Sequence, residues 1–214
     1  MLVGNAEFRP RDEMTLSMRV ITRTGSRRVA KAAFELASQR KKHLTYVHKD
    51  TVFKLGCGMF VEECKKLAPE YPDVLVDDVI VDTMAMRLVR DPQNFDVIVT
   101  TNMFGDILSD EAAGLVGGLG MAPGLCIGDG DVAMAQATHG SAPDIYGKMI
   151  ANPIGQIWSG AMMLDHLGYP EAGNAIFSAI EKVLSSGAGH APLTPDLGGN
   201  AKTDDLGKAI AAAI

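Results

Sequence analysis

Hydrophobic and polar positions follow two different periods in the first part of the chain. Residues 16–22 alternate apolar and polar side chains, which is typical of a half-buried strand. Residues 24–42 instead carry apolar side chains at helical spacing, with Thr24 or Ser26 placed to cap the start of the helix. Residues 1–15 show no clear period, so we expect a loop or an extended arm there.

Short strands and helices alternate through the rest of the chain. The pattern predicts strands at 44–48, 74–76, 96–100 and 125–127, and helices at 58–67, 83–89, 106–115, 154–167, 172–184 and 204–214. This alternation favours an α/β fold with a mainly parallel sheet and flanking helices. The glycine-rich stretch 117–130 is the best candidate for a crossover between two domains, because glycine adopts backbone conformations that other residues resist.

Composition and charge exclude several classes of partner. The net charge of -6 argues against a general nucleic-acid binder, which needs a basic surface. The seven basic residues between Arg23 and Lys42 favour a solvated helix face with a basic C-terminal end over a binding patch. No apolar run is long enough to span a membrane and no apolar leader is visible at the start. We expect a cytoplasmic protein, with the mitochondrial matrix as the alternative.

The three cysteines give no metal-binding pattern. No Cys-x-x-Cys occurs, which suits a reducing compartment and disfavours zinc. Cys57 and Cys64 lie seven residues apart, so both are predicted to face the core from one side of a helix.

Candidate chemistry begins with Asp106 and Asp110. Residues four apart stack on one face of a helix, so these carboxylates repel each other unless a cation lies between them. They follow a buried strand, and α/β proteins place ligands at the carboxyl edge of the sheet. Hard oxygen ligands favour Mg²⁺ or Mn²⁺. Two exposed aspartates near a helix N-terminus are the alternative, which spacing alone leaves open.

Asp82 and Lys49 also follow predicted strands. Asp82 comes directly after Val79-Ile-Val, where it is placed either for ligand binding or as a helix cap. Lys49 follows Thr45-Tyr-Val-His and is a candidate general acid or base if its surroundings lower its pKa, although such a lysine is more often a surface charge. His48 points to the opposite face and is interpreted as structural.

The loop at 139–152 is a candidate binding site. Its small residues let the backbone approach a flat ligand, and Asp144 is placed to accept hydrogen bonds from ribose hydroxyls. No Gly-x-Gly-x-x-Gly follows a strand, so a standard Rossmann site is not supported. A compact loop without a ligand remains the alternative at this point.

Four segments together resemble the β-decarboxylating dehydrogenases of the isocitrate/isopropylmalate type, which include tartrate and D-malate enzymes. In order and spacing, the matching segments are 81–86, 102–120, 139–152 and 196–203. The resemblance implies an isopropylmalate dehydrogenase-like fold. Residues 1–117 would form the substrate and dimerisation domain with an N-terminal arm, and 118–214 the C-terminal part of the nucleotide-binding domain.

The resemblance also implies a reaction and its residues. Such enzymes oxidise, and usually decarboxylate, a 2-hydroxy diacid with NAD or NADP and Mg²⁺ or Mn²⁺, the metal acting as a Lewis acid. Asp106 and Asp110 match metal ligands. Asp82 matches a metal-binding and catalytic aspartate, and Lys49 the catalytic lysine, both acting in the partner's site. A homodimer is therefore implied.

In the nucleotide loop, His139 and Asn152 match residues that hold the adenine, and Asp144 matches the acidic residue on the ribose. The rest of the implied cofactor-binding set comprises Gly140, Ser141, Ala142 and Ile145. Relatives that use NADP tend to carry Lys-Tyr in place of Asp144-Ile145. We expect NAD, because an aspartate repels a 2′-phosphate.

The chain departs from the family pattern at its start. Relatives carry a longer N-terminal segment, with the first strands of the large domain, the arginines that bind the substrate and a catalytic tyrosine. We therefore expect the N-terminal part of the large domain to be absent and the 214-residue chain alone to be inactive. The alternative is a non-catalytic nucleotide-binding or assembly subunit that partners a full-length relative. Isopropylmalate, isocitrate, tartrate, D-malate and homoisocitrate all remain candidate substrates.

Overall fold

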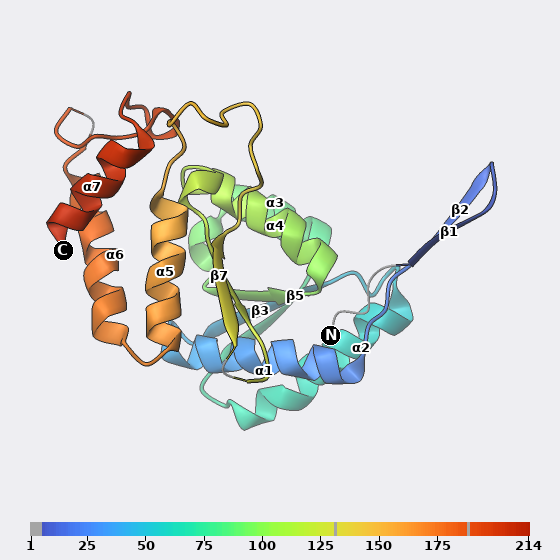
Figure 1. Cartoon of the computed structure of the whole chain (residues 1–214). Helices are drawn as coiled ribbons and strands as arrows, with labels where there is room; N and C mark the ends of the chain where they lie inside the picture. Colours follow the sequence, from blue (N-terminus) through green and yellow to red (C-terminus); the bar gives the residue numbers. More distant parts are fainter. Residues whose placement is uncertain (1–5, 131, 188) are drawn as a thin grey trace. The chain divides into compact units, whose positions relative to one another are not determined.

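The computed structural model describes residues 6–130, 132–187 and 189–214, and it has the expected α/β architecture (Figure 1). The chain divides into two compact units, Met1–Ser109 and Asp110–Ile214. This division falls before the predicted boundary at 117/118, since the helix at the boundary belongs partly to each unit. The functional assignment of the two domains stays a prediction.

A parallel sheet forms the centre of the first unit. Its strands are β3 (His43–His48), β4 (Leu75–Ile80) and β5 (Val97–Thr100), in the order β4-β3-β5. Leu44 of β3 pairs with Val76 on one side and with Val97 on the other. The middle strand is almost wholly buried, as expected for a strand covered on both faces. The predicted parallel sheet is thus confirmed.

Helices alternate with the strands of this sheet along the chain. Their bounds are α1 (Arg23–Gln39), α2 (Lys54–Leu67), α3 (Val81–Arg90) and α4 (Asn102–Leu115). Thr22 caps α1, since its side chain accepts a hydrogen bond from the Gly25 N–H. Phe34 of α1 and Phe60 of α2 are completely buried in one apolar cluster with Leu44. Cys57 and Cys64 are likewise buried, which confirms their predicted place in the core.

The N-terminal region forms a β-hairpin, where the sequence predicts a loop or an extended arm over 1–15 and a strand at 16–22. Strand β1 (Ala6–Arg11) pairs antiparallel with β2 (Met14–Met18), and both are drawn as one narrow ribbon in Figure 1. All of β2 is exposed. Met14, Leu16 and Met18 do alternate with polar residues, but all three side chains are exposed, so the predicted half-burial is wrong. The strand also begins and ends before the predicted range. Residues 1–5 of the expected arm lie outside the described part.

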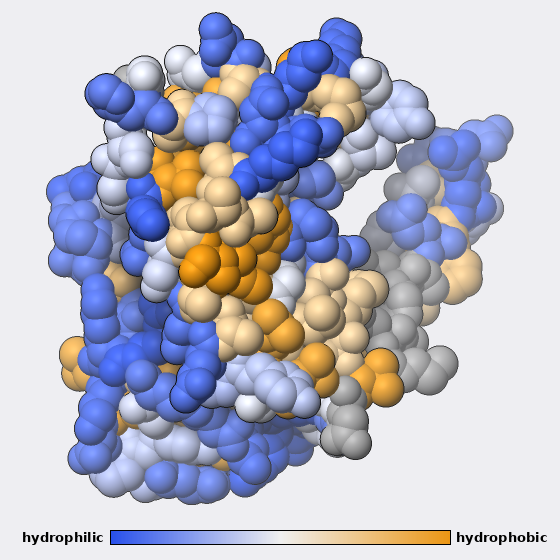
Figure 2. All heavy atoms as spheres, turned by 60° about the vertical axis from the view of Figure 1, so that its left-hand side comes forward, coloured by the Kyte–Doolittle hydropathy of each residue, from blue (hydrophilic) through white to orange (hydrophobic). Residues whose placement is uncertain are grey.

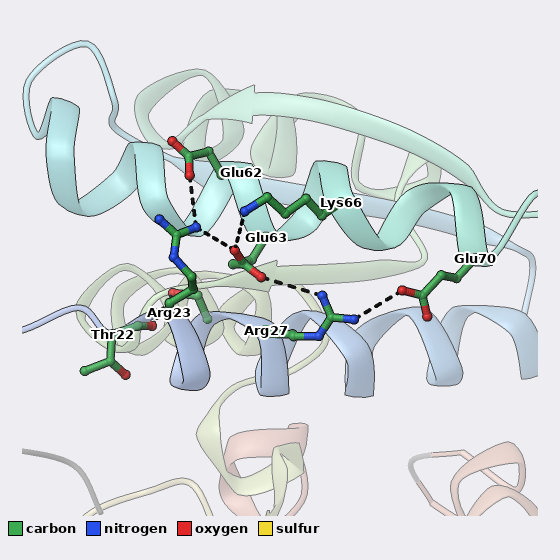
Figure 3. A network of polar contacts seen from close by, with 8 residues as sticks. Thr22, Arg23, Arg27, Glu62, Glu63, Lys66 and Glu70 are labelled. Atoms are coloured by element: carbon green, nitrogen blue, oxygen red, sulfur yellow. Dashed lines mark hydrogen bonds and ion pairs between the residues drawn. The ribbon is translucent and has the colours of Figure 1, made fainter.

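Arg23 and Arg27 of α1 are paired with acidic residues of α2 and of the short helical turn that follows it (Figure 3). Arg23 contacts Glu63 at 2.7 Å and Glu62 at 3.0 Å, and Arg27 contacts Glu63 at 3.7 Å and Glu70 at 3.2 Å. Glu63 is buried, whereas both arginines are half exposed. The expected solvated face is therefore an interhelical ion network. The expected basic end is also wrong, because α1 ends at Gln39 before the last basic residues.

The second unit contains a strand pair and three helices. Strands β6 (Pro123–Ile127) and β7 (Ala133–Ala137) pair antiparallel, and the helices are α5 (Ile154–His166), α6 (Pro170–Ser185) and α7 (Thr203–Ala213). Ile154, Ile180, Leu206 and Ile210 join the three helices in one buried cluster. The sequence pattern does not predict β7, because its alanines contrast weakly with their neighbours.

Short 3₁₀ helices connect several elements. They are η1 (Ala68–Glu70), η2 (Pro92–Asn94), η3 (Leu119–Met121) and η4 (Pro195–Leu197). In the ranges that the structure describes, no helix has the length and hydropathy needed to cross a membrane. Figure 2 shows an apolar area on an otherwise largely hydrophilic face, and such areas are typical of surfaces that meet a ligand or another chain.

Candidate active-site residues and a nucleotide-sized hollow

The first group of candidate residues follows the carboxyl ends of the parallel strands. Lys49 comes directly after β3, and Asp82 is the second residue of α3, which continues from β4. Asp106 lies in the first half of α4, the helix that follows β5. Because parallel strands end at the same edge of a sheet, the topology brings these three positions to the edge where α/β proteins bind ligands.

Lys49 and Asp82 form a close ion pair. The Lys49 Nζ lies 2.8 Å from the Asp82 Oδ1, with the lysine side chain 24% exposed and the aspartate 62% exposed. The Lys49 hydrogen bond, helped by the backbone N–H groups at the start of α3, lowers the pKa of Asp82 below its usual value. Ile80, not Asp82, occupies the N-cap position of α3. Lys49 is therefore a paired group at the sheet edge rather than an isolated surface charge.

Asp106 and Asp110 lie one turn apart on α4, as predicted from their spacing. Both are exposed, while Phe104 and Leu108 of the same helix are buried. Neither aspartate makes an ion pair within the described part of the chain. Two carboxylates on one helical face, without a basic neighbour, are a donor set that suits Mg²⁺ or Mn²⁺. The structure does not join them to Asp82: among the described residues, no group of three or more acidic, histidine or cysteine side chains is placed to hold a metal.

A hollow of about 680 Å³ in the second unit collects the other predicted residues. Six of the seven predicted cofactor-binding residues line it, namely His139, Gly140, Ser141, Ala142, Ile145 and Asn152. The seventh, Asp144, is exposed but is not among the lining residues. The volume is within the range of small-molecule and cofactor sites.

Asn152 and Asp196 are hydrogen-bonded polar residues in the lining of this hollow. The Asn152 side-chain amide donates to the Asp196 Oδ2 at 2.9 Å, and its Oδ1 accepts from the backbone N–H of Ile154 at 2.9 Å. A Cβ added to Gly120 would lie 2.8 Å from the Asn152 Cβ and 3.0 Å from the Asp196 Oδ2. Glycine is therefore required at position 120 for η3 to approach this pair.

The loop that borders the hollow has unusual backbone conformations. Ala142 and Met149 have positive φ angles of 43° and 56° although neither is glycine, and both line the hollow. Such conformations cost free energy and are found mainly where surrounding structure enforces them, often at binding sites. A flat ligand with polar edges fits a hollow in which backbone and small side chains lie beside an amide and a carboxylate. The residues suit a nicotinamide dinucleotide in this respect.

Sequence reasoning missed several lining residues, notably Asp196, Tyr146 and Thr203. The segment at 196–203 contributes to the family resemblance, but the resemblance implies no site residue within it. Its distance along the chain from residues 139–152 gives no sign that the two segments meet. The hydrogen bond between Asn152 and Asp196 supplies that link.

Comparison with known proteins identifies the family. A family model described as isocitrate/isopropylmalate dehydrogenase matches residues 4–210. The chain belongs to this family. It is 47% identical over 203 residues to the 3-isopropylmalate dehydrogenase of Archaeoglobus fulgidus, covering 94% of this chain and 61% of that protein.

Another relative and a solved structure agree with this membership. The isocitrate/homoisocitrate dehydrogenase of Thermus thermophilus is 48% identical over 203 residues, covering 94% of this chain and 59% of the relative. The crystal structure of isocitrate dehydrogenase from Methylococcus capsulatus superposes with a TM-score of 0.91 at 44% identity, covering 97% of this chain and 62% of that one. The expected isocitrate/isopropylmalate dehydrogenase family and α/β fold are confirmed. The chain spans roughly three fifths of the length of these relatives.

Proposed function

We propose that this protein is a dehydrogenase that oxidises a 2-hydroxy diacid with NAD in the presence of Mg²⁺ or Mn²⁺. The observation that carries the proposal is the Lys49–Asp82 pair, with its 2.8 Å contact at the carboxyl edge of the parallel sheet. The relatives are named for isopropylmalate, isocitrate and homoisocitrate. Because the chain covers only part of their length, the activity is proposed for the protein as its gene encodes it.

Each residue has a distinct part in the proposed chemistry. The Lys49 ammonium exchanges a proton with the substrate, and Asp82 holds the Lys49 Nζ in place. Asp82, Asp106 and Asp110 are proposed to hold the metal, which supplies Lewis-acid stabilisation of charge that develops on substrate oxygens. The residues lining the hollow hold the nucleotide. Asp144, in the loop that borders the hollow, favours NAD by repelling a 2′-phosphate.

The direct test follows reduction of NAD and of NADP by the protein as its gene encodes it, with each candidate diacid and with and without Mg²⁺. We expect turnover of at least one diacid, dependence on the divalent metal and a preference for NAD. Lys49→Met is expected to lower kcat by about 10²–10⁴, the usual contribution of a positioned acid or base. Lys31→Met, which breaks the exposed Lys31–Glu35 pair, is the matched control. A Lys49→Met variant as active as the control would refute the proposed role.

The proposed homodimer has its own test, because Lys49 and Asp82 are expected to act in the partner's site. Two inactive variants, Lys49→Met and Asp106→Asn, are unfolded together and refolded as a mixture. In a mixed dimer one site then receives Asp106 from one chain and Lys49 from the other, so roughly a quarter of the wild-type activity should return. If Lys49 serves the site of its own chain, every site in the mixture lacks one residue and the activity stays absent.

A further inference from the structure

A buried polar cluster lies immediately before Lys49 in the chain. The side chain of His48 is only 3% exposed, and its Nε2 lies 2.5 Å from the Asp78 Oδ1. The Tyr46 hydroxyl donates to the other oxygen of the same carboxylate, Oδ2, at 2.8 Å. Tyr46 and His48 are two residues apart on β3, so they share one face of the sheet and hold Asp78 of β4 together.

The charge on Asp78 decides which group donates. Partial burial raises the pKa of Asp78, but the hydrogen bonds from His48 and Tyr46 lower it by a larger amount. The pKa of Asp78 therefore lies below its usual value. An ionised carboxylate only accepts hydrogen bonds. The proton in the contact with His48 is therefore on the histidine Nε2, which donates across the two strands.

The other nitrogen of the His48 ring contacts the residue after Lys49. The backbone N–H of Asp50 donates to the His48 Nδ1 at 3.2 Å, and the Asp50 Oδ1 also lies 3.2 Å from this nitrogen. A neutral ring accepts from the N–H, whereas a protonated ring donates to the carboxylate. Both ring nitrogens of His48 thus have a partner in either protonation state. Lys49 lies in the chain between His48 and Asp50, which are held together by the contact at Nδ1.

The remaining charged and titratable neighbours come from α2. Lys65 Nζ lies 3.5 Å from the Asp78 Oδ2 and offsets part of its charge. Burial, followed by the charge of Asp78, raises the pKa of Cys64 to about 12, so Cys64 stays a neutral thiol. Lys65 is therefore the only charged group that α2 brings to this cluster among the contacts of the described residues.

We infer that His48 is a positioning residue, which ties Asp78 of β4 to the turn at Asp50 and thereby holds Lys49 against Asp82. The path along the chain supports this inference, because β4 continues directly into α3. The same two segments are joined twice within a few residues, by His48 to Asp78 and by Lys49 to Asp82. Loss of the contact between His48 and Asp78 would free the turn at Asp50, and the position of Lys49 against Asp82 depends on this turn. The inference rests on the proposed function only for its effect on catalysis.

The test uses His48→Phe, which keeps an aromatic ring but removes both hydrogen bonds. In ¹⁵N-labelled protein, the Lys49 Nζ resonance should move toward its position in Asp82→Asn, where the ion pair is broken. The kcat should fall about 10- to 100-fold with little change in KM, because the lost contact positions a reacting group rather than binding substrate. His48→Gln should restore most of kcat and most of the wild-type position of the Lys49 Nζ resonance, since the glutamine side-chain amide can donate to Asp78.

His43→Phe is the matched control. His43 also joins β3 to β4, with its Nε2 2.8 Å from the Asp77 Oδ2, but at the opposite end of the strand from Lys49. We expect it to lower stability without moving the Lys49 resonance. The inference is overturned if folded His48→Phe leaves that resonance unchanged, or if His43→Phe shifts it equally. Should His48→Phe not fold, His48→Asn takes its place, because its shorter amide does not reach Asp78. The resonance needs no substrate, so a lack of activity in the protein as its gene encodes it would refute the proposed function but not this inference.

Discussion

The two units of the chain carry their candidate chemistry on different kinds of structure. In the first unit, Lys49 and Asp82 follow two paired strands, and the ladder between β3 and β4 is regular over its whole length. In the second, the hollow is bordered by a loop with positive φ angles and by a glycine that permits close approach. Proton transfer needs side chains fixed to within fractions of an ångström, which paired strands provide. A flat ligand needs access to the backbone, which loops with small residues provide.

The distribution of charge follows the same division. Most of the ion pairs described above lie in the first unit, whereas the contact of Lys208 with Asp204 in the second is exposed. The hollow relies instead on the neutral–ionic hydrogen bond between Asn152 and Asp196. Substitutions that remove a side-chain charge should therefore have their largest effects in the first unit. Substitutions that increase side-chain volume should have theirs at the hollow of the second unit.

The largest expected effect is that of Asp82→Asn on catalysis. The change keeps the shape of the side chain but removes the charge that holds the Lys49 Nζ, so kcat should fall by about 10²–10⁴ while the melting temperature changes little. Steady-state kinetics with the best diacid measures it. Asp73→Asn is the control, since Asp73 forms an exposed pair with Lys42 at 3.6 Å, away from the site. Equal kcat values for Asp82→Asn and Asp73→Asn would show that Asp82 has no part in catalysis.

A change of volume at Gly120 should have the next largest effect. Gly120→Val places side-chain atoms against Asn152 and Asp196, where even a Cβ is within 3.0 Å of both. Losing this hydrogen-bonded pair should weaken NAD binding by about 1–3 kcal/mol, measured by titration calorimetry. Gly114→Val on α4 is the control, because a Cβ there meets no atom within 4 Å. Unchanged affinity in a folded Gly120→Val protein would show that the dinucleotide binds elsewhere.

The sequence predicts regular elements better than it predicts what meets in space. The buried strand at 96–100 and the helix at 154–167 were both found, because a continuous apolar run and a helical period reflect burial directly. Strand β7 consists largely of alanine, so no strong period marks it, whereas β2 alternates apolar and polar residues although all of it is exposed. Asp106 and Asp110 were placed correctly on one helix from their spacing alone.

Contacts between segments that are distant along the chain cannot be predicted from the sequence pattern. His48 is interpreted from the sequence as structural, but its partner Asp78 is thirty residues away and nothing in the pattern connects the two. Asp196 was part of a recognised segment, yet only folding places it beside Asn152. The family resemblance assigns Lys49 and Asp82 to the same kind of site without a contact between them, and the structure adds that contact.

The ion network of the first unit predicts a smaller, pH-dependent effect on stability. The hydrogen bonds of Arg23 and Lys66 to Glu63 outweigh its burial and lower its pKa. Its stabilisation is therefore complete above the pKa of an unfolded glutamate and is lost as the pH falls toward the lower, folded value. Glu63→Gln should cost about 1–3 kcal/mol near neutral pH and progressively less in acid. Urea unfolding across this pH range measures the difference.

The exposed pair of Lys31 with Glu35 supplies the comparison for this network. Glu35→Gln should change stability by less than about 0.5 kcal/mol, because exposed pairs on a helix contribute little. Both residues of that pair are more than half exposed, whereas the Glu63 side chain is 3% exposed. A cost for Glu63→Gln that does not shrink in acid would mean that packing, rather than charge, carries its contribution.

The smallest expected effect concerns Lys42, which follows α1 with a φ of 57°. Its N–H donates to the Ala37 carbonyl at 3.1 Å, a contact typical of a helix end that favours glycine. The left-handed conformation costs a non-glycine residue about 1–2 kcal/mol, while glycine loses about 0.5–1 kcal/mol more entropy on folding. Lys42→Gly should therefore stabilise the protein by about 0.5 kcal/mol, since its exposed contact with Asp73 contributes little. Lys41→Gly lacks the positive φ and should destabilise instead, so urea unfolding of the two variants separates backbone strain from the loss of a basic side chain.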